Sequence, residues 1–494
     1  MDDILAGLQL FLSVENILAI SAGMCLGVIV GAIPGLTATM GIALVLPFTF
    51  GMSPEAAVLL LVGIYKGGIY AGSISAILIK TPGTPASACT ILDGWPLASQ
   101  GHARKALDMS LYASCIADFL SNLALIFLAG MIATFALRFG PPEYFWLMCF
   151  SLTVVISVSG SSLIKGMIGV TIGLLLSTVG LDLVFGGPRF TFGMIELTGG
   201  LSFVPLLIGL FAVPEIFDFY VRKASESTRV KATGEPLRWI EFRSSLKTIF
   251  KGSFIGLVIG AIPGTGASVA SFLSYAEAKR TSPNRSRFGK GELEGVAASE
   301  AGNNGVAGAT LIPLLALGIP GDVVTAVIIG AFLIHGISVG PMLFEKHGDF
   351  VYAIYWGILC STAVMFVAGK IAIRNFSKIA AIEPAVLMPT ILLFCFFGTY
   401  AINNSSFDLI IMISAGLLGY AMLRLDYSPA PLLIGFILGP LFEDNFRRSL
   451  LMGQGDLTVF VRSEISWLFI ILTALSLVIS LRQQHTIAKG YGIN

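Results

Sequence analysis

The sequence has little charge. Asp, Glu, Lys and Arg together make up 12% of its 494 residues, whereas soluble domains carry about 25%. Hydrophobic residues make up 55%, and the mean hydropathy is +0.87. This composition excludes an ordinary soluble protein and indicates an integral protein of the lipid bilayer. The net charge of +1 gives no reason to expect a nucleic-acid partner.

Several motifs are absent from the sequence. There is no GxxxxGK[ST] phosphate loop, which excludes ATP hydrolysis through that motif. The four histidines lie far apart without an HExxH pattern, and the six cysteines show no paired spacing, so we expect neither a histidine or cysteine metal site nor disulfides. Residues 1–7 are acidic where a secretory signal would be basic, so no cleaved signal peptide is expected.

Long apolar runs are abundant instead. Leu111–Leu137, Phe145–Leu163 and Ile465–Leu481 match the roughly 20 residues that a helix needs to span a bilayer. We therefore expect an all-α polytopic membrane protein with about 10–14 membrane segments, some of them broken or re-entrant helices.

One short motif, GAIPG, occurs twice, at Gly31–Gly35 and Gly260–Gly264. The surrounding segments Gly27–Gly41 and Gly256–Ala270 align without gaps and share seven of fifteen residues. A second pair of segments, AGSISAILIKTPGTP and AGATLIPLLALGIPGD, follows at similar spacing, and each reaches a Pro-Gly. Because both motifs recur in the same order, we predict two homologous halves.

A polar stretch separates these halves. Arg222–Lys251 carries eight Lys and Arg residues against three acids. We therefore predict an N-terminal membrane repeat at 1–221, a basic cytoplasmic linker at 222–251 and a C-terminal membrane repeat at 252–494.

The basic residues also predict how the halves are oriented. No Lys or Arg precedes Lys66, whereas the second GAIPG segment has basic residues on both sides. Since cytoplasmic loops are enriched in Lys and Arg, the two equivalent segments should be flanked on opposite sides of the membrane. This predicts inverted-topology repeats, with each GAIPG as a turn inside the membrane. Arg482 and Lys489 in the C-terminal tail argue against this orientation.

Broken helices at membrane depth expose backbone groups that need partners. Such breaks are tolerated where they are buried in protein or line a wet cavity. In transporters, half-helix N-termini attract anions and free carbonyls bind Na⁺. The simpler alternative is that each Pro-Gly only kinks a helix for packing. Four breaks in repeat register favour one binding site between the halves.

Polar residues around the breaks are the candidate ligands, because hydroxyls cap half-helices and amides both donate and accept hydrogen bonds. The residues predicted to bind the substrate are Gly35, Thr37, Lys80, Thr81, Gly83, Thr84, Ser87, Gly264, Asn303, Asn304, Pro320 and Gly321. The residues predicted to bind a coupling ion are Thr39, Thr265, Ser268, Glu300, Asn303 and Asp322. We expect Thr84 or Ser87, and Asp322, to cap the helices that follow them.

The charged residues near these motifs allow more than one role. Lys66 and Lys80 offer cations to an anionic substrate, although Lys80 could equally extend to the membrane interface. Glu300 could carry a proton, bind a cation or pair with a lysine. Asp182 and Arg189 are predicted to form a structural or interfacial pair.

Four classes of function remain to be compared. A secondary transporter driven by an ion gradient agrees with the missing phosphate loop and the polar breaks. An intramembrane enzyme acting on a lipid-linked phosphate would need a cluster of paired acids or histidines, and none is evident. A passive channel does not require two halves that carry different polar residues. A scaffold subunit does not explain polar groups within the membrane.

The longest motifs resemble one known family. They are GAIPGLTATMGIALVLPFTFGM, KGGIYAGSISAILIKTPGTPASACTILDGWPLA, GAIPGTGASVASFLSY and SEAGNNGVAGATLIPLLALGIPGD. GLDLVFGGPRFTFGMIELTGG and GFILGPLFEDNFRRSL are similar to that family as well. It is the large membrane subunit of the bacterial tripartite tricarboxylate transporters, and the resemblance covers essentially the whole chain.

The resemblance implies a function in detail. The chain would import citrate or a related carboxylate with Na⁺ or protons across the bacterial inner membrane, without enzymatic activity. Its partners would be a small membrane subunit and a periplasmic solute-binding protein that delivers the substrate. An elevator-like mechanism would suit the inverted repeats, and a homo-oligomer is compatible with them. We expect no cofactor apart from bound Na⁺. A stand-alone organic-anion permease is the alternative.

Overall fold

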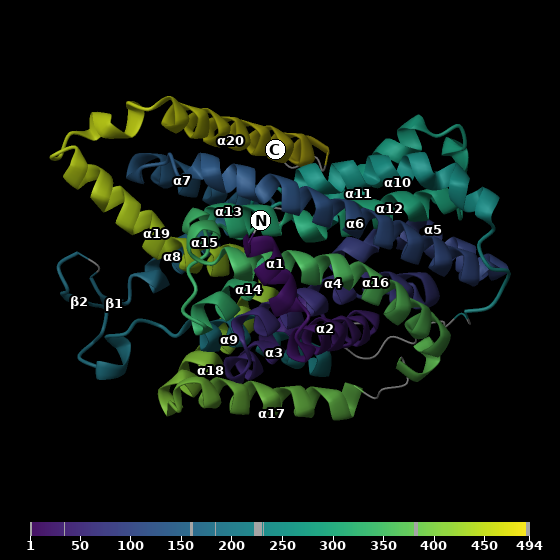
Figure 1. Ribbon diagram of the computed structural model, residues 1–494, viewed down its shortest axis with the longest axis horizontal. Coiled ribbons are helices and arrows are strands. Elements are labelled where there is room, and N and C mark those ends of the chain that lie inside the picture. Colours follow the sequence, from purple (N-terminus) through teal and green to yellow (C-terminus); the bar gives the residue numbers. More distant parts are fainter. Residues whose placement is uncertain are drawn as a thin grey trace. The chain divides into compact units, whose positions relative to one another are not determined.

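The computed structural model describes residues 2–33, 35–158, 162–182, 184–221, 230, 232–379 and 384–490 (Figure 1). Helices dominate it, and the strands among these residues are β1 (Gly180–Leu181) and β2 (Pro188–Arg189), which pair antiparallel. The predicted all-α polytopic class is therefore confirmed.

Many of the helices are apolar enough to lie in a membrane. By length and composition, six described helices can cross it: Val14–Ala32, Pro54–Ile79, Ile91–Ala136, Gly348–Phe376, Ser406–Arg424 and Glu464–Arg482. Shorter apolar helices are Ala38–Gly51, Leu163–Ser177, Val323–Ile334 and Leu387–Asn403. The predicted 10–14 segments include such short helices, and the number of actual crossings stays a prediction.

The chain forms two compact units. Unit 1 comprises residues 1–133, 215–262 and 266–398, and unit 2 comprises 134–214, 263–265 and 399–494. Unit 1 holds α1 (Asp2–Phe11), α2 (Val14–Ala32), α3 (Ala38–Val45), η1 (Leu46–Gly51), α4 (Pro54–Ile79), η2 (Pro85–Ala88), α5 (Ile91–Leu97), η3 (Ala98–His102), α10 (Trp239–Gly260), α11 (Gly266–Thr281), η5 (Arg285–Arg287), α12 (Leu293–Ala309), α13 (Leu311–Leu317), α14 (Val323–Ile334), α15 (Pro341–Lys346) and α16 (Gly348–Ile379).

Unit 2 holds β1, β2, α7 (Pro141–Val158), α8 (Leu163–Ser177), η4 (Ile195–Leu197), α18 (Ser406–Arg424), α19 (Ala430–Met452), η6 (Leu457–Val461) and α20 (Glu464–Gly490). The helices α6 (Ala103–Ala136), α9 (Phe203–Val221) and α17 (Pro384–Asn403) contribute to both units. Each unit contains residues from both predicted halves of the sequence. The predicted repeat boundaries at 221 and 252 concern sequence repetition, so the packing of the two units does not test them. Residues 222–229 and 231 of the predicted linker lie outside the described residues.

The same helix pairing occurs in each half of the sequence within unit 1. The helix that enters GAIPG packs against the long helix after the break, α2 against α4 and α10 against α12. Glycines make this approach possible, because a Cβ at Gly27 would collide with the Ile64 carbonyl oxygen and one at Gly256 would lie 2.6 Å from that of Gly302. These two glycines are equivalent in the repeat alignment.

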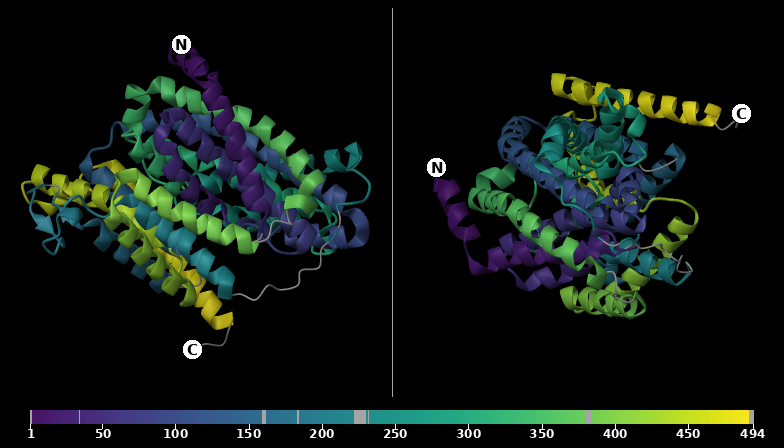
Figure 2. Two further views of the ribbon diagram at one scale, coloured as in Figure 1. Left: turned by 90° about the horizontal axis from the view of Figure 1, so that it is seen from below. Right: turned by 90° about the vertical axis from the view of Figure 1, so that its right-hand side faces the viewer.

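Helix α4 is the centre of unit 1. It begins with Ser53 as N-cap and Pro54 at the first helical position, a combination typical of helix starts. Its whole apolar window is buried, with α2, α3, α12, α14 and α16 packed around it. Helix α1 in turn covers α16 (Figure 2). Polar side chains on α4 are therefore shielded from lipid.

Unit 2 contains a cross-linked loop between α8 and α9. The predicted pair is confirmed, because Arg189 lies 3.4 Å from the Asp182 carboxylate. Arg189 also donates two hydrogen bonds to Glu443, and Arg447 forms ion pairs with Asp182 and Glu443. Four charged side chains therefore tie this loop to α19.

Candidate substrate and ion site

Both GAIPG motifs interrupt a helix, as the sequence predicts. Helix α2 ends at Ala32, and α3 begins after Thr37, whose Oγ1 accepts a hydrogen bond of 3.2 Å from the Met40 N–H. Gly35 has φ +88°, a left-handed conformation that favours glycine. In the second copy α10 ends at Gly260, and Gly264 has φ +84°.

The residues of these two breaks differ in their surroundings. Gly35 is exposed, and Thr37 and Thr39 are half-buried in unit 1. Thr265 and Ser268 are also half-buried. Gly264 and Thr265 belong to unit 2, whereas all the other predicted ligands belong to unit 1. Pro34, at the centre of the first motif, lies outside the described residues.

The first TPGTP segment folds back onto α4. Lys80 ends α4 with φ 55°, and its side chain is exposed. Thr81 is half-buried, and its hydroxyl donates to the Ile79 carbonyl at 3.3 Å. The Gly83 N–H donates to the Gly72 carbonyl at 3.2 Å, and a Cβ at Gly83 would collide with the Gly31 carbonyl oxygen. Glycines therefore allow three parts of the backbone to pack closely together: the end of α2, the middle of α4 and this segment.

Thr84 and Ser87 hold the start of η2. The Thr84 N–H donates to Ser87 Oγ at 3.2 Å, and this hydroxyl donates to the Thr84 carbonyl at 2.8 Å. Thr84 is therefore the N-cap residue of η2, one of the two predicted alternatives, and Ser87 within η2 bonds back to its backbone. The hydroxyl oxygen of Thr84 is buried and has no hydrogen-bond partner among the described residues. It lies over Gly72, where an added Cβ would be 2.8 Å away.

The equivalent segment of the second half ends in the predicted cap. Asp322 is the N-cap of α14, and its Oδ1 accepts from the Thr325 N–H at 2.7 Å. Tyr65 on α4 donates to its Oδ2 at 2.6 Å, so both carboxylate oxygens already have partners. Pro320 and Gly321 are buried beside it, and Gly321 packs against the backbone of Thr310.

Glu300 on α12 is the most unusual group in this region. Its side chain is fully buried and accepts hydrogen bonds from Ser73 on α4 at 2.6 Å, from Ser114 on α6 at 3.0 Å and from Thr90 before α5. No Lys, Arg or His within the described part of the chain forms an ion pair with it. We call Glu300 and these three hydroxyl residues the Glu300 cage.

Two of the predicted substrate ligands have polar groups without partners and adjoin the cage. Asn303 lies one helical turn after Glu300, is fully buried, and neither its Oδ1 nor its Nδ2 has a hydrogen-bond partner among the described residues. Thr84 is the other. Its hydroxyl lies over Gly72, which directly precedes the cage residue Ser73 in the sequence. Asn304 differs, since its Nδ2 donates to Ser114 at 2.8 Å. Buried polar atoms without partners are rare and suit a ligand.

Lys66 does not provide the free cation that its sequence position suggested. Its ammonium group lies 2.9 Å from Asp118 and donates to Asn122 on α6 at 2.7 Å and to Ser361 on α16 at 3.1 Å. All of these side chains are buried. Sequence reasoning missed Asp118, although a lone acid in the apolar run Leu111–Leu137 was a signal for a buried partner.

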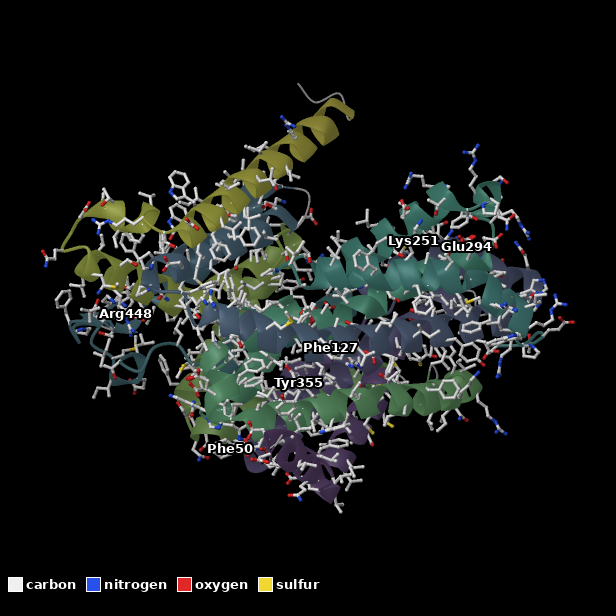
Figure 3. All side chains as sticks on the ribbon, turned by 45° about the horizontal axis from the view of Figure 1, so that its top comes forward. Phe50, Phe127, Lys251, Glu294, Tyr355 and Arg448 are labelled. Carbon is white, nitrogen blue, oxygen red and sulfur yellow. The ribbon has the colours of Figure 1, made fainter. Side chains whose placement is uncertain are left out.

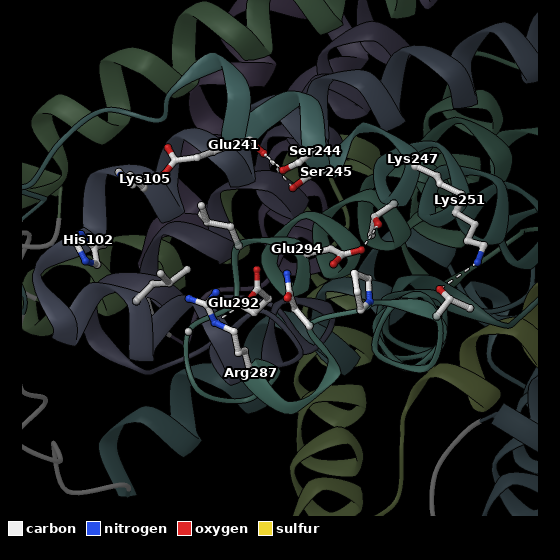
Figure 4. Close-up of a pocket in the computed structure, with 17 residues that line it drawn as sticks. His102, Lys105, Glu241, Ser244, Ser245, Lys247, Lys251, Arg287, Glu292 and Glu294 are labelled. Atoms are coloured by element: carbon white, nitrogen blue, oxygen red, sulfur yellow. Dashed lines mark hydrogen bonds and ion pairs between the residues drawn. The ribbon is translucent and has the colours of Figure 1, made fainter.

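A polar cavity of about 540 Å³ lies elsewhere in unit 1 (Figure 4). Residues of η3, α6, α10 and the segment before α12 line it, and none of the predicted ligands does. Some of its charges are engaged, in the ion pair Arg287–Glu292 and in the hydrogen bond between Thr248 and Glu294. Lys251 lies in the middle of α10, and Glu294 lies in the first turn of α12 (Figure 3). Lys and Arg side chains as well as Glu side chains line this cavity.

Comparison with known proteins finds similar sequences. The chain is 39% identical over 467 residues to an "Uncharacterized 52.8 kDa protein in TAR-I ttuC' 3'region" of Agrobacterium vitis, which covers 93% of this chain and 92% of that protein. An "Uncharacterized protein in TAR-II ttuC' 3'region" of the same organism is 41% identical over 215 residues, 43% of this chain and 87% of that protein. No solved structure is detectably similar.

The family model described as "Tripartite tricarboxylate transporter TctA family" matches residues 17–434. This range contains both GAIPG breaks, the Glu300 cage and Asn303. The match spans both units and most of the chain. The chain therefore belongs to the tripartite tricarboxylate transporter TctA family.

Proposed function

We propose that this chain is the translocating membrane subunit of an importer for citrate or a related carboxylate. A Na⁺ or proton gradient drives it, a periplasmic solute-binding protein delivers the substrate, and a small membrane subunit completes the assembly in the bacterial inner membrane. Family membership supports a role in a tripartite transporter. The elevator-like motion of inverted repeats remains part of this proposal.

The observation that carries the proposal is the Glu300 cage. An ionised carboxylate in a low-dielectric interior is costly unless a positive charge compensates it. Three hydroxyl donors stabilise the Glu300 carboxylate but do not neutralise it. A cation or proton taken from solution supplies the missing charge, and hydroxyl and carboxylate oxygens are suitable ligands for Na⁺. The cage is therefore the proposed coupling-ion site.

The substrate is assigned to the unpartnered groups next to the cage. The Asn303 amide and the Thr84 hydroxyl can both donate hydrogen bonds, which a carboxylate accepts. The break residues Gly35 and Thr37, which belong to the same unit, remain candidate ligands. Because the cage and these donors are adjacent, a bound cation would attract the substrate electrostatically and so couple the two binding events.

Uptake of radiolabelled citrate tests the proposed function. Cells lacking other citrate carriers would express the chain with its small subunit and binding protein, with and without external Na⁺ and at two external pH values. We expect uptake that needs all three components and either Na⁺ or a proton gradient. Uptake without the binding protein would instead indicate a stand-alone permease, and uptake independent of both ions would contradict the proposal.

A further inference from the structure

Four aromatic side chains from three helices of unit 1 form one continuous wall. Tyr112 on α6 stacks with Phe366 on α16 at a ring distance of 6.1 Å and contacts Phe242 on α10 edge-on at 5.6 Å. Trp239 adjoins Phe242 at 5.5 Å. With Cys115, Ile116 and Leu237, these rings line an open groove of about 460 Å³, which we call the aromatic groove.

The aromatic groove opens to the side of apolar helices. The segments containing α6 and α16 are both apolar enough to cross a membrane. Phe366 is 42% exposed, and Trp239 and the neighbouring Ile240 are 70% and 74% exposed. Tryptophan is enriched where the hydrocarbon core meets the headgroups. The groove is therefore an exposed apolar surface beside helices that can cross a membrane, and Trp239 is exposed next to it.

Positive charge also lies beside the aromatic wall. The Lys370 ammonium group lies 4.5 Å from the centre of the Tyr112 ring and shares Asp108 with Arg104. Arg374 follows Lys370 by one turn of α16, and Arg243 follows Phe242. Both arginines are exposed, and neither has an ion pair within the described ranges.

The charge balance beside the groove is positive. Asp108 faces two cations, Arg104 and Lys370. Glu241 is engaged by Lys105 and Arg238, and Glu235 by Lys105. Arg243 also lies in the basic stretch 222–251, which the positive-inside rule assigns to the cytoplasmic side. The basic residues beside the groove therefore meet the inner leaflet, whose anionic headgroups attract Lys and Arg.

We propose that the aromatic groove binds an anionic phospholipid of the inner leaflet. One acyl chain lies along the wall of Tyr112, Phe366, Phe242 and Trp239, and Arg243 and Arg374 contact the phosphate. A membrane helix of another protein fits the groove less well, because helix pairs pack through small residues whereas this wall consists of large rings. Such a helix would also leave the two arginines without a counter-charge.

Fluorescence quenching of Trp239 tests this proposal. A variant keeps Trp239 and carries Phe at the other tryptophans, Trp95, Trp146, Trp356 and Trp467. The purified chain is reconstituted in phosphatidylcholine vesicles that contain a small fraction of phosphatidylglycerol or phosphatidylcholine with brominated acyl chains. We expect the phosphatidylglycerol to quench Trp239 with about thirtyfold higher apparent affinity, because two arginines face its net negative charge, which choline cancels in phosphatidylcholine.

Matched controls distinguish quenching by a lipid bound in the groove from quenching that reflects only the exposure of a tryptophan to the bilayer. Arg243→Gln with Arg374→Gln should remove the headgroup preference and leave quenching by both lipids equal. A variant that keeps only Trp467, which is 51% exposed on α20, should show no preference at all. If the multiple-Phe variants do not fold, the number of phosphatidylglycerol molecules retained by the wild type and by the double arginine variant is compared by native mass spectrometry.

Two outcomes would overturn the proposal. Equal quenching of Trp239 by both brominated lipids would show that the groove has no headgroup selectivity. Absence of quenching by either lipid would show that lipid does not enter, as expected if a second copy of the chain covers the groove. In native mass spectrometry, equal retention by wild type and double variant would count against it as well.

Discussion

At the scale of single residues, Glu300 and Asn303 lie one turn apart on α12 in opposite situations. The Glu300 carboxylate accepts hydrogen bonds from three hydroxyl groups, whereas both polar atoms of the Asn303 amide lack partners. A buried amide that stabilised the fold would be hydrogen-bonded. The contrast therefore supports the proposal that Asn303 binds a ligand.

Substitution of Asn303 should separate transport from stability. Asn303→Ala removes no hydrogen bond of the described structure, so we expect an unchanged melting temperature and a loss of citrate uptake of tenfold or more. Thr84→Ala should behave in the same way. The neighbouring Asn304→Ala is the control, because it removes a bond to Ser114 and should cost about 1–3 kcal/mol of stability. Normal uptake by both test variants would refute the substrate assignment.

The Lys66–Asp118 ion pair should be structural. Lys66→Met leaves the Asp118 carboxylate buried without its cation, which typically costs about 3–5 kcal/mol of unfolding free energy. The double variant Lys66→Met/Asp118→Leu removes both charges and should regain most of that loss. Thermal unfolding in detergent measures both variants. A single variant as stable as the wild type would show that the pair contributes little to folding.

At the scale of elements, the two GAIPG helices owe their packing to glycine rows. Gly27 and Gly256 occupy the same place in the repeat, and each faces a backbone carbonyl of the long helix it packs on. This explains why the motif recurs with its flanking glycines, since any Cβ there forces the helix pair apart. The sequence repeat therefore corresponds to the same close helix packing, which occurs twice within unit 1.

Gly27→Ala and Gly256→Ala should destabilise the chain. Alanine improves helix propensity by up to about 1 kcal/mol, but overpacking against backbone costs about 1–3 kcal/mol, and the second effect should prevail. Gly130→Ala on α6 is the matched control, because its Cβ meets no atom within 4 Å. Melting temperatures measure all three variants. A destabilised control, or two unaffected test variants, would contradict this account of the packing.

The loop that contains Asp182 should contribute a pH-dependent stability. Hydrogen bonds from the Phe185 and Val184 backbone N–H groups, together with Arg447, lower the pKa of Asp182 to about 2. Because this pKa lies below the ordinary value of 3.8, the ionised carboxylate stabilises the folded chain fully above about pH 4 and loses that effect as the pH falls toward 2.

The melting temperature of Asp182→Asn relative to wild type measures this contribution. The difference between the two proteins should be largest at pH 5 and above and should shrink steadily between about pH 4 and pH 2. The absolute melting temperatures will also change, because other carboxylates titrate in this range. A difference that stays constant over that range would show that the Asp182 pKa is not lowered.

At the scale of the whole molecule, the sequence predicted the fold class, the two breaks and the Asp322 cap, because Pro-Gly and a following acid act locally. It did not predict the Glu300 cage. Ser73, Thr90 and Ser114 are ordinary hydroxyl residues in apolar segments, and only the packing of α4, α5 and α6 around α12 brings them to one carboxylate. The Lys66–Asp118 pair was missed for the same reason.

The account as a whole depends on an external cation or proton completing the Glu300 cage. The most direct measurement is the thermal unfolding of the purified chain with Na⁺ replaced stepwise by choline, repeated at two pH values. The wild type, Glu300→Gln and Glu294→Gln are compared, since Glu294 lies on the same helix outside the cage and binds Thr248 and Ser282.

We predict that Na⁺ or a lower pH stabilises the wild type and Glu294→Gln, by about 2.7 kcal/mol at a hundred times the dissociation constant for Na⁺. Glu300→Gln should lose this response, because its neutral amide needs no counter-charge. If the wild type and Glu300→Gln responded identically to both Na⁺ and pH, that result would contradict the central claim.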